Sequence, residues 1–193
     1  MPLTRQLSLF GIEATVPVPD DLAGLLAGPG QVVRMGGTAR VSVVVEERWR
    51  AASLVAEMRD RGFAATCVAT VDEHLGVRTP YSTTLAPLAA AWLRGALKLP
   101  PLGFAMNGRR LRLWTAAAGY RDGFELTWRL GRCEDSVEIT MQRALATVGL
   151  PTEILAGNAR SGPALRLSGR RRLARLAEII GDAPASAPPD AWP

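Results

Sequence analysis

Few side chains in this sequence have the type and spacing that catalysis or metal binding requires. The only histidine, His74, lies in a predicted turn beside Asp72 and Glu73, with no identifiable nucleophile nearby. The two cysteines, Cys67 and Cys133, are far apart and lack the neighbouring ligands of a zinc site. No glycine-rich phosphate loop is present. The residues therefore favour a binding protein over an enzyme, with no cofactor and no metal.

Basic side chains are numerous, and almost all of them are arginine. Of 23 basic residues only Lys98 is a lysine, and the formal net charge is +5. A positive protein is compatible with a polyanionic partner, because neutralising phosphates supplies most of the non-specific affinity for nucleic acid. The arginine bias, with abundant alanine, glycine and proline, also indicates a GC-rich coding background of the actinobacterial kind. The arginines alone therefore do not establish a binding surface.

A short peptide near the N-terminus combines a polar anchor with apolar side chains. Its sequence is Gln6-Leu7-Ser8-Leu9-Phe10. The Gln6 amide can donate and accept hydrogen bonds at a pocket rim, and each apolar side chain could contribute about 1.5–3 kcal/mol by burial. After the costs of ordering the tail and of association, we expect micromolar affinity for a partner. The alternative is that the apolar side chains pack on the protein's own core as an edge strand.

This pentapeptide resembles the motif by which bacterial replication and repair proteins bind the sliding clamp, the beta subunit of DNA polymerase III. The resemblance covers every position of the motif, but only five residues. It implies that residues 6–10 bind the clamp as a transient partner.

The two ends of the chain are predicted to be tails. Residues 1–19 form a flexible N-terminal tail, and residues 183–193 are too rich in proline and alanine to pack regularly, so we expect them to be disordered. Trp192, in that segment, is either a second short partner motif or a chance tail residue. No stretch is long and apolar enough to span a membrane, and no signal peptide is recognisable. We expect a cytoplasmic, nucleoid-associated protein.

Between the tails, residues 20–182 contain an internal repeat, which predicts an α+β fold of two αββαββ(α) units. The first unit, at about 20–83, has a short helix that stops at Gly28-Pro29-Gly30, strands at 32–35 and 39–45, a helix at 47–61, and strands at 64–71 and 76–81. The second unit, at about 84–182, has a helix at 84–99, strands at 111–117 and 124–130, a helix at 134–148, strands at 152–156 and 163–168, and a helix at 170–180.

The first helix of each unit carries a family resemblance. Leu22-Ala23-Gly24-Leu25-Leu26-Ala27-Gly28-Pro29-Gly30 resembles the nine-residue motif of LAGLIDADG homing endonucleases, and residues 93–101 resemble a weaker second copy. The resemblance implies two pseudo-twofold-related repeats whose strands form a saddle-shaped sheet on duplex DNA. It also implies that the two motif helices cross, with the small residues Ala23, Gly24 and Gly95 allowing close approach. The second half also resembles the corresponding domain of WhiA-type regulators.

The sequence departs from this family where its nucleases hold metal ions. Family nucleases place one acidic residue near the foot of each motif helix, and hard divalent cations need such oxygen ligands. Those positions here are Pro29 and Pro100, which offer no side-chain ligand. Asp20 and Asp21 lie at the other end of the first helix, about 10 Å away. We therefore expect no endonuclease activity.

Strand alternation predicts which side chains face the DNA. In the second strand, Val41, Val43 and Val45 point toward the helices, which leaves Arg40 outward. Applied to each predicted strand, the same rule selects Arg34, Arg40, Arg110, Arg112, Arg129 and Arg166 as phosphate contacts. The alternative is that these arginines are solvated strand residues.

Two hypotheses follow. The first is a non-catalytic DNA-binding accessory protein of replication or repair, recruited to the sliding clamp. The second is a WhiA-like regulator or a protein-interaction scaffold without clamp binding. Because the fused repeats already bury the central helices, we expect a monomer.

Overall fold

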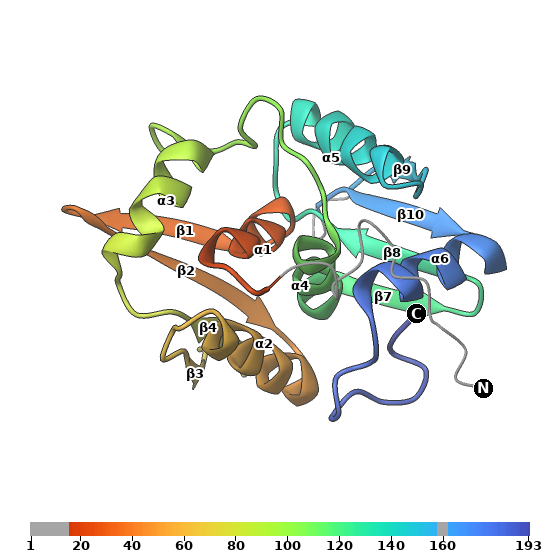
Figure 1. The fold of residues 1–193 in the computed structure, drawn as a ribbon, viewed down its shortest axis with the longest axis horizontal. Helices are drawn as coiled ribbons and strands as arrows, with labels where there is room; N and C mark the ends of the chain where they lie inside the picture. Colours follow the sequence, from red (N-terminus) through yellow and green to blue (C-terminus); the bar gives the residue numbers. More distant parts are fainter. Residues whose placement is uncertain (1–15, 158–161) are drawn as a thin grey trace.

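A computed structural model describes residues 16–157 and 162–193 of the chain. The pentapeptide Gln6–Phe10 lies outside the described residues. Two units with the same order of elements follow one another (Figure 1). The first contains a 3₁₀ turn η2 (Pro19–Leu22), α1 (Ala23–Ala27), β1 (Gln31–Met35), β2 (Thr38–Val45), α2 (Arg48–Asp60), β3 (Thr66–Ala69), β4 (Leu75–Arg78), a 3₁₀ turn η3 (Thr83–Leu85) and α3 (Ala86–Trp92).

A short hairpin of β5 (Leu93–Arg94) and β6 (Leu97–Lys98) connects the first unit to the second. The second unit contains α4 (Gly108–Ala118), β7 (Gly119–Asp122), β8 (Glu125–Arg129), α5 (Asp135–Thr147), β9 (Glu153–Leu155), β10 (Ala164–Ser168) and α6 (Arg170–Ile180). Both units therefore have the order αββαββα, which confirms the predicted fold class. No helix among the described residues is both long enough and apolar enough to cross a membrane.

Each unit forms one antiparallel sheet, and the two sheets have the same topology. The strand orders are β1-β2-β4-β3 and β7-β8-β10-β9. Apolar side chains on one face of each sheet pack against the helices, as strand alternation predicts. The buried residues of this face include Val41, Val43, Val45 and Val77 in the first sheet and Leu126, Trp128, Leu165 and Leu167 in the second.

The two sheets are joined through α1 and α4, which lie side by side at the centre of the molecule (Figure 1). Their backbones touch at Gly24, where a Cβ atom would lie 2.0 Å from the carbonyl oxygen of Arg110. Only glycine fits this contact, and the helix that meets Gly24 is α4 rather than the helix predicted over 84–99. Ala23, beside it, is also buried, at 1% exposed.

The second central helix is not the one that the sequence predicted. Residues 111–117 were expected to form a strand, but they lie in α4, which begins where the Asn107 side chain accepts a hydrogen bond from the backbone N–H of Arg110. Most residues of this helix are buried, so its apolar residues do not recur with the period of 3.6 that marks a helix with one exposed face. Leu111 and Leu113 therefore fit the alternating pattern of a strand.

The helix predicted over 84–99 is correspondingly shorter, since α3 ends at Trp92. Gly95 lies in the turn between β5 and β6 with φ of 63°, and it packs against no central helix. The expectation that Gly95 mediates helix crossing was therefore wrong. A turn that requires positive φ explains the glycine.

The C-terminal segment is also ordered rather than free. Trp192 is 4% exposed, its indole N–H donates to the carbonyl of Gly181 (3.0 Å), and the Arg112 guanidinium lies over its ring. A guanidinium N–H of Arg121 donates to the Trp192 carbonyl over 2.6 Å. Residues 183–193 were expected to be a disordered tail, whereas in the structure Trp192 packs on the folded part, as one large aromatic side chain can do in a segment of low local propensity.

The contact at Gly24 generates a prediction for stability. We expect Gly24→Ala to lower the free energy of unfolding by about 3 kcal/mol, because α1 and α4 must separate to admit the methyl group. Urea denaturation followed by circular dichroism measures this loss. Gly37→Ala is the matched control, since no atom lies within 4 Å of its added Cβ. Equal stability of the two variants would show that the helices do not meet at Gly24.

Candidate nucleic-acid interface

Each sheet has a second face, formed by the side chains that alternate with the buried ones. The face of the first sheet that lies away from the helices, called the first open face, contains Val33, Met35, Arg40, Ser42, Val44, Thr66, Val68 and Arg78. On the second sheet the second open face contains Tyr120, Asp122, Glu125, Arg129, Glu153 and Arg166. Sheets of this kind can lie along a nucleic-acid backbone, so the charges on the two faces decide what they can bind.

The first open face carries two arginines without carboxylate partners among the described residues. Arg40 lies over the ring of Tyr81, with its guanidinium carbon 4.7 Å from the ring centroid. Arg78 is exposed and stands directly opposite Ser42 on one neighbouring strand and Thr66 on the other. Cross-strand partners on one face lie about 5 Å apart, so Arg78 is flanked by two hydroxyl groups. This combination suits a phosphate group.

Apolar side chains accompany these arginines on the first open face. They are between 40% and 59% exposed, and they comprise Val33, Met35, Val44 and Val68. Exposed apolar side chains at neighbouring strand positions indicate a contact surface rather than a purely solvated one.

On the second open face, the arginines are paired with carboxylates. Arg166 donates to Glu153 over 2.7 Å and lies 3.7 Å from Glu125, and the hydrogen bond to Glu153 raises the pKa of its guanidinium. Arg129 stacks on Tyr120, with 4.1 Å to the ring centroid, and donates to Glu46 over 3.3 Å. These arginines already have anionic partners.

Of the six arginines predicted to contact DNA, Arg40, Arg129 and Arg166 lie on the open faces and three lie elsewhere. Arg34 pairs with Ala39, which is fully buried, so its side chain belongs to the helix side of the sheet at the hairpin tip. Arg34 is therefore not on the open face, because the register of the hairpin places it opposite a buried residue.

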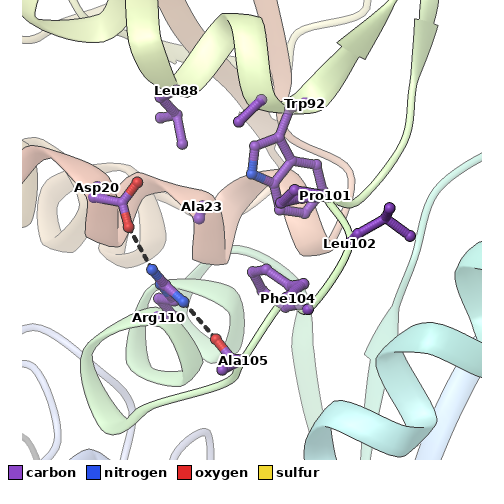
Figure 2. Close-up of a pocket in the computed structure, with 11 residues that line it drawn as sticks. Asp20, Ala23, Leu88, Trp92, Pro101, Leu102, Phe104, Ala105 and Arg110 are labelled. Atoms are coloured by element: carbon purple, nitrogen blue, oxygen red, sulfur yellow. Dashed lines mark hydrogen bonds and ion pairs between the residues drawn. The ribbon is translucent and has the colours of Figure 1, made fainter.

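Arg110 and Arg112 belong to α4 and make structural ion pairs on the helix side. Arg110 joins Asp20 to the carbonyl of Ala105 beside a hollow of about 180 Å³, which Figure 2 shows between α1 and the 101–105 loop. Arg112 pairs with Glu57 and donates to the carbonyls of Ile180 and Asp182. Their predicted exposure on a sheet failed because the predicted strand is a helix.

The sequence prediction missed Arg78, although the signal was available. Val77 is fully buried in β4, so alternation from it turns Arg78 to the open face. Arg50 and Lys98, which bind backbone carbonyls near the ends of the central helices, could not be identified in this way, because their partners lie far away in the sequence.

Between the two open faces lies a hollow of about 200 Å³ at the ends of the central helices. Its lining includes Pro29 after α1, Ala117 and Ala118 at the end of α4, and a single carboxylate, Glu46. Pro100 was expected at the foot of the second helix, but it follows β6 instead. The foot of the second central helix, α4, instead carries Ala117 and Ala118.

Basic side chains bind carbonyls at the end of α4 and in the turn that follows α1. Arg50, which is 3% exposed, donates to the carbonyls of Thr115 (3.2 Å), Ala116 (3.0 Å) and Gly119 (2.6 Å) at the end of α4. A cation at a helix C-terminus is also favoured by the helix dipole.

Lys98 binds the turn that follows α1, a helix that ends at Ala27. Its ammonium donates to the carbonyls of Gly28 (2.6 Å) and Gly30 (2.7 Å), and burial lowers its pKa to about 8. The chemistry at the helix ends is therefore cationic. Within residues 16–157 and 162–193, no group of three or more histidine, cysteine, aspartate and glutamate side chains could hold a metal ion.

Comparison with known protein families and with curated proteins found no match. Among solved structures, the homing endonuclease I-WcaI bound to its DNA recognition sequence superposes with a TM-score of 0.64 at 10% identity, over 93% of this chain and 90% of that one. The fold is that of the LAGLIDADG homing endonucleases.

Two further structures with this fold come from a second group. The N-terminal LAGLIDADG domain of DUF199/WhiA superposes with a TM-score of 0.54 at 12% identity, covering 85% of this chain and 82% of the domain. Full-length DUF199/WhiA from Thermatoga maritima gives 0.57 at 10% identity, and the match covers 84% of this chain but only 54% of that protein. At such identities the likeness establishes the fold alone.

The end of α4 offers a direct test of the cation's role. We expect Arg50→Met to lower the free energy of unfolding by about 3 kcal/mol, because three carbonyls at the end of α4 lose a charged donor, although the Thr115 carbonyl keeps the backbone N–H of Gly119. Thermal and urea denaturation measure the loss. Arg48→Met, an exposed position two residues earlier on α2, is the matched control and should change stability by less than about 0.5 kcal/mol. A loss of equal size in both variants would show that the helix end needs no cation.

Proposed function

We propose that this protein is a non-catalytic, DNA-binding accessory protein of bacterial DNA replication or repair. In this proposal, Gln6, Leu7, Ser8, Leu9 and Phe10 recruit it to the sliding clamp, and the open faces of the LAGLIDADG-type fold contact duplex DNA. The protein acts as a monomer, because the two fused repeats bury the central helices against each other.

The clamp part rests on the pentapeptide. It supplies the polar anchor and the three apolar side chains that the clamp-binding motif requires, in the right order. Such a short segment gives moderate affinity, which suits a protein that visits the clamp transiently.

The DNA part is supported by the fold and by Arg40 and Arg78. The structure of I-WcaI, which has the same fold, contains its DNA recognition sequence. Here two unpaired arginines and neighbouring hydroxyl groups lie on an open sheet face. A surface of this kind binds phosphates without reading bases.

The observation that carries the non-catalytic part is the chemistry at the helix ends. Metal-dependent cleavage needs carboxylates there to hold divalent cations. Pro29 and Ala118 offer none, and the ends of α1 and α4 are occupied by the cations Lys98 and Arg50. Neighbouring positive charges raise the cost of placing a divalent metal at this position.

One observation favours the second candidate function, a WhiA-like regulator or a protein-interaction scaffold. The apolar side chains Val33, Met35, Val44 and Val68 would suit a protein partner on the first open face. Salt-dependent binding to duplex DNA separates the two candidates, because phosphate contacts release counterions and apolar contacts do not.

Recruitment is tested by calorimetry with the purified sliding clamp. We expect micromolar binding for the wild type and at least a tenfold loss for Gln6→Ala and for the Leu9→Ala, Phe10→Ala double variant, because anchor and apolar contacts are removed. Thr4→Ala, outside the motif, is the control and should bind normally.

The same variants distinguish the alternative use of the peptide. If the apolar side chains packed on the protein's own core, the double variant would have a lower Tm. Absence of clamp binding at about 100 μM wild-type protein would remove the clamp from the proposal.

The proposed absence of nuclease activity is tested by incubating the protein with supercoiled plasmid in Mg²⁺ or Mn²⁺ and measuring the fraction that is cut. We expect the plasmid to stay uncut, because a single carboxylate, Glu46, lines the hollow at the helix ends. Glu46→Gln should behave as the wild type does. Metal-dependent nicking that disappears in Glu46→Gln would show that the site is catalytic after all.

A further inference from the structure

We infer that the protein holds duplex DNA with only one of its two sheets: the first open face binds the phosphate backbone, and the second open face does not. This inference rests on the proposed DNA-binding function and assigns it to one half of a pseudo-symmetric fold. It follows from the different charge pairing on the two faces.

The first open face has cations and no carboxylates on its strands. Arg40 and Arg78 face outward from adjacent strands, β2 and β4. Asp72 and Glu73 lie in the turn between β3 and β4, past the ends of the strands. A phosphate that approaches Arg78 meets a guanidinium flanked by the Ser42 and Thr66 hydroxyls. All three groups can donate hydrogen bonds to it.

The second open face has the opposite character. Asp122, Glu125 and Glu153 point outward from three strands, and Arg166 is held between two of these carboxylates. A phosphate that replaced Glu153 at Arg166 would break an existing ion pair and would remain close to the other acidic groups. Like charges at such distances repel, so this face gains little from contact with the DNA backbone.

Arg129 does not restore a cationic surface to this half. It is already bonded to Glu46 and to the Tyr120 hydroxyl, and its guanidinium stacks on the Tyr120 ring. Arg129 and Tyr120 line the central hollow, so Arg129 does not extend a phosphate-binding row along β8.

The salt dependence of binding measures how many phosphates are neutralised. The slope of log K against log salt concentration is about −0.9 per phosphate contacted on B-form DNA. We expect a slope near −2 for the wild type, since two unpaired arginines take part. Six contacting arginines spread over both sheets would give a slope near −5.

The experiment is fluorescence anisotropy of a short labelled duplex, titrated with full-length protein at several salt concentrations. The variants are two double substitutions with the same change of charge, Arg40→Gln, Arg78→Gln on the first face and Arg129→Gln, Arg166→Gln on the second. We expect the first pair to reduce the slope by about 2 and the affinity by at least tenfold. The second pair should leave the affinity within about twofold of wild type.

A third variant tests the repulsion directly. Glu125→Gln, Glu153→Gln removes two negative charges from the second open face and frees Arg166, so we expect tighter binding and a steeper slope. Because Arg40 is half-buried over Tyr81, Arg78→Gln alone serves if the first double variant does not fold. This exposed position should reduce the slope by about 1.

The outcomes separate this inference from the proposed function. Equal losses in the two double arginine variants would overturn the inference and leave DNA binding in place on both sheets. DNA affinity unchanged by Arg40→Gln, Arg78→Gln would also overturn it, and would leave the first open face to a protein partner. Absence of salt-dependent DNA binding in the wild type would overturn the proposed DNA-binding function, and the inference with it.

Discussion

The structure depends on two central helices that approach closely enough for their backbones to touch. At Gly24 there is no room for a side chain between α1 and α4. Helices packed so closely end beside each other in the middle of the molecule, where their last carbonyls have few available partners. Arg50 donates to carbonyls at the end of α4, Lys98 donates to the carbonyls of Gly28 and Gly30 just after α1, and both cations come from elements outside the two helices. The close packing of α1 against α4 and the two cations beside their C-terminal ends therefore stabilise the same region of the molecule.

The cations beside the ends of α1 and α4 also limit which ligands this region can bind. Carboxylates at the same helix ends would attract divalent cations and could support hydrolysis of a phosphodiester. Here Arg50 and Lys98 form hydrogen bonds with backbone carbonyls, so these polar groups have partners within the protein. The two sheets have open faces on which an extended ligand could lie, whereas the contacts at the centre stabilise the packing of the helices. In the proposed function, the exposed faces of the sheets, rather than the hollow between them, contact the DNA.

The sequence was a good guide wherever local pattern and final position agree. Alternating valines around Val43 defined β2, and the small residues Ala23 and Gly24 identified a helix that must pack closely. The second central helix was missed because α4 is buried almost all round, so Leu111 and Leu113 carried no helical period. The ion pairs of Arg112 and Arg166, the position of Trp192 and the reach of Arg50 across 69 positions to Gly119 all depend on contacts between distant segments. No local pattern encodes them.

The cations at the helix ends make the two halves of the chain unequal, although their topology is the same. Arg50 is the third residue of α2, and the third residue of α5 is the buried Val137. Lys98, the only lysine, belongs to the connector after the first half. The second half by itself therefore contains neither cation, and the end of α4 takes its charged donor from the first half. The two halves therefore depend on each other, because a side chain of the first half supplies a hydrogen-bond donor to the end of the central helix in the second half.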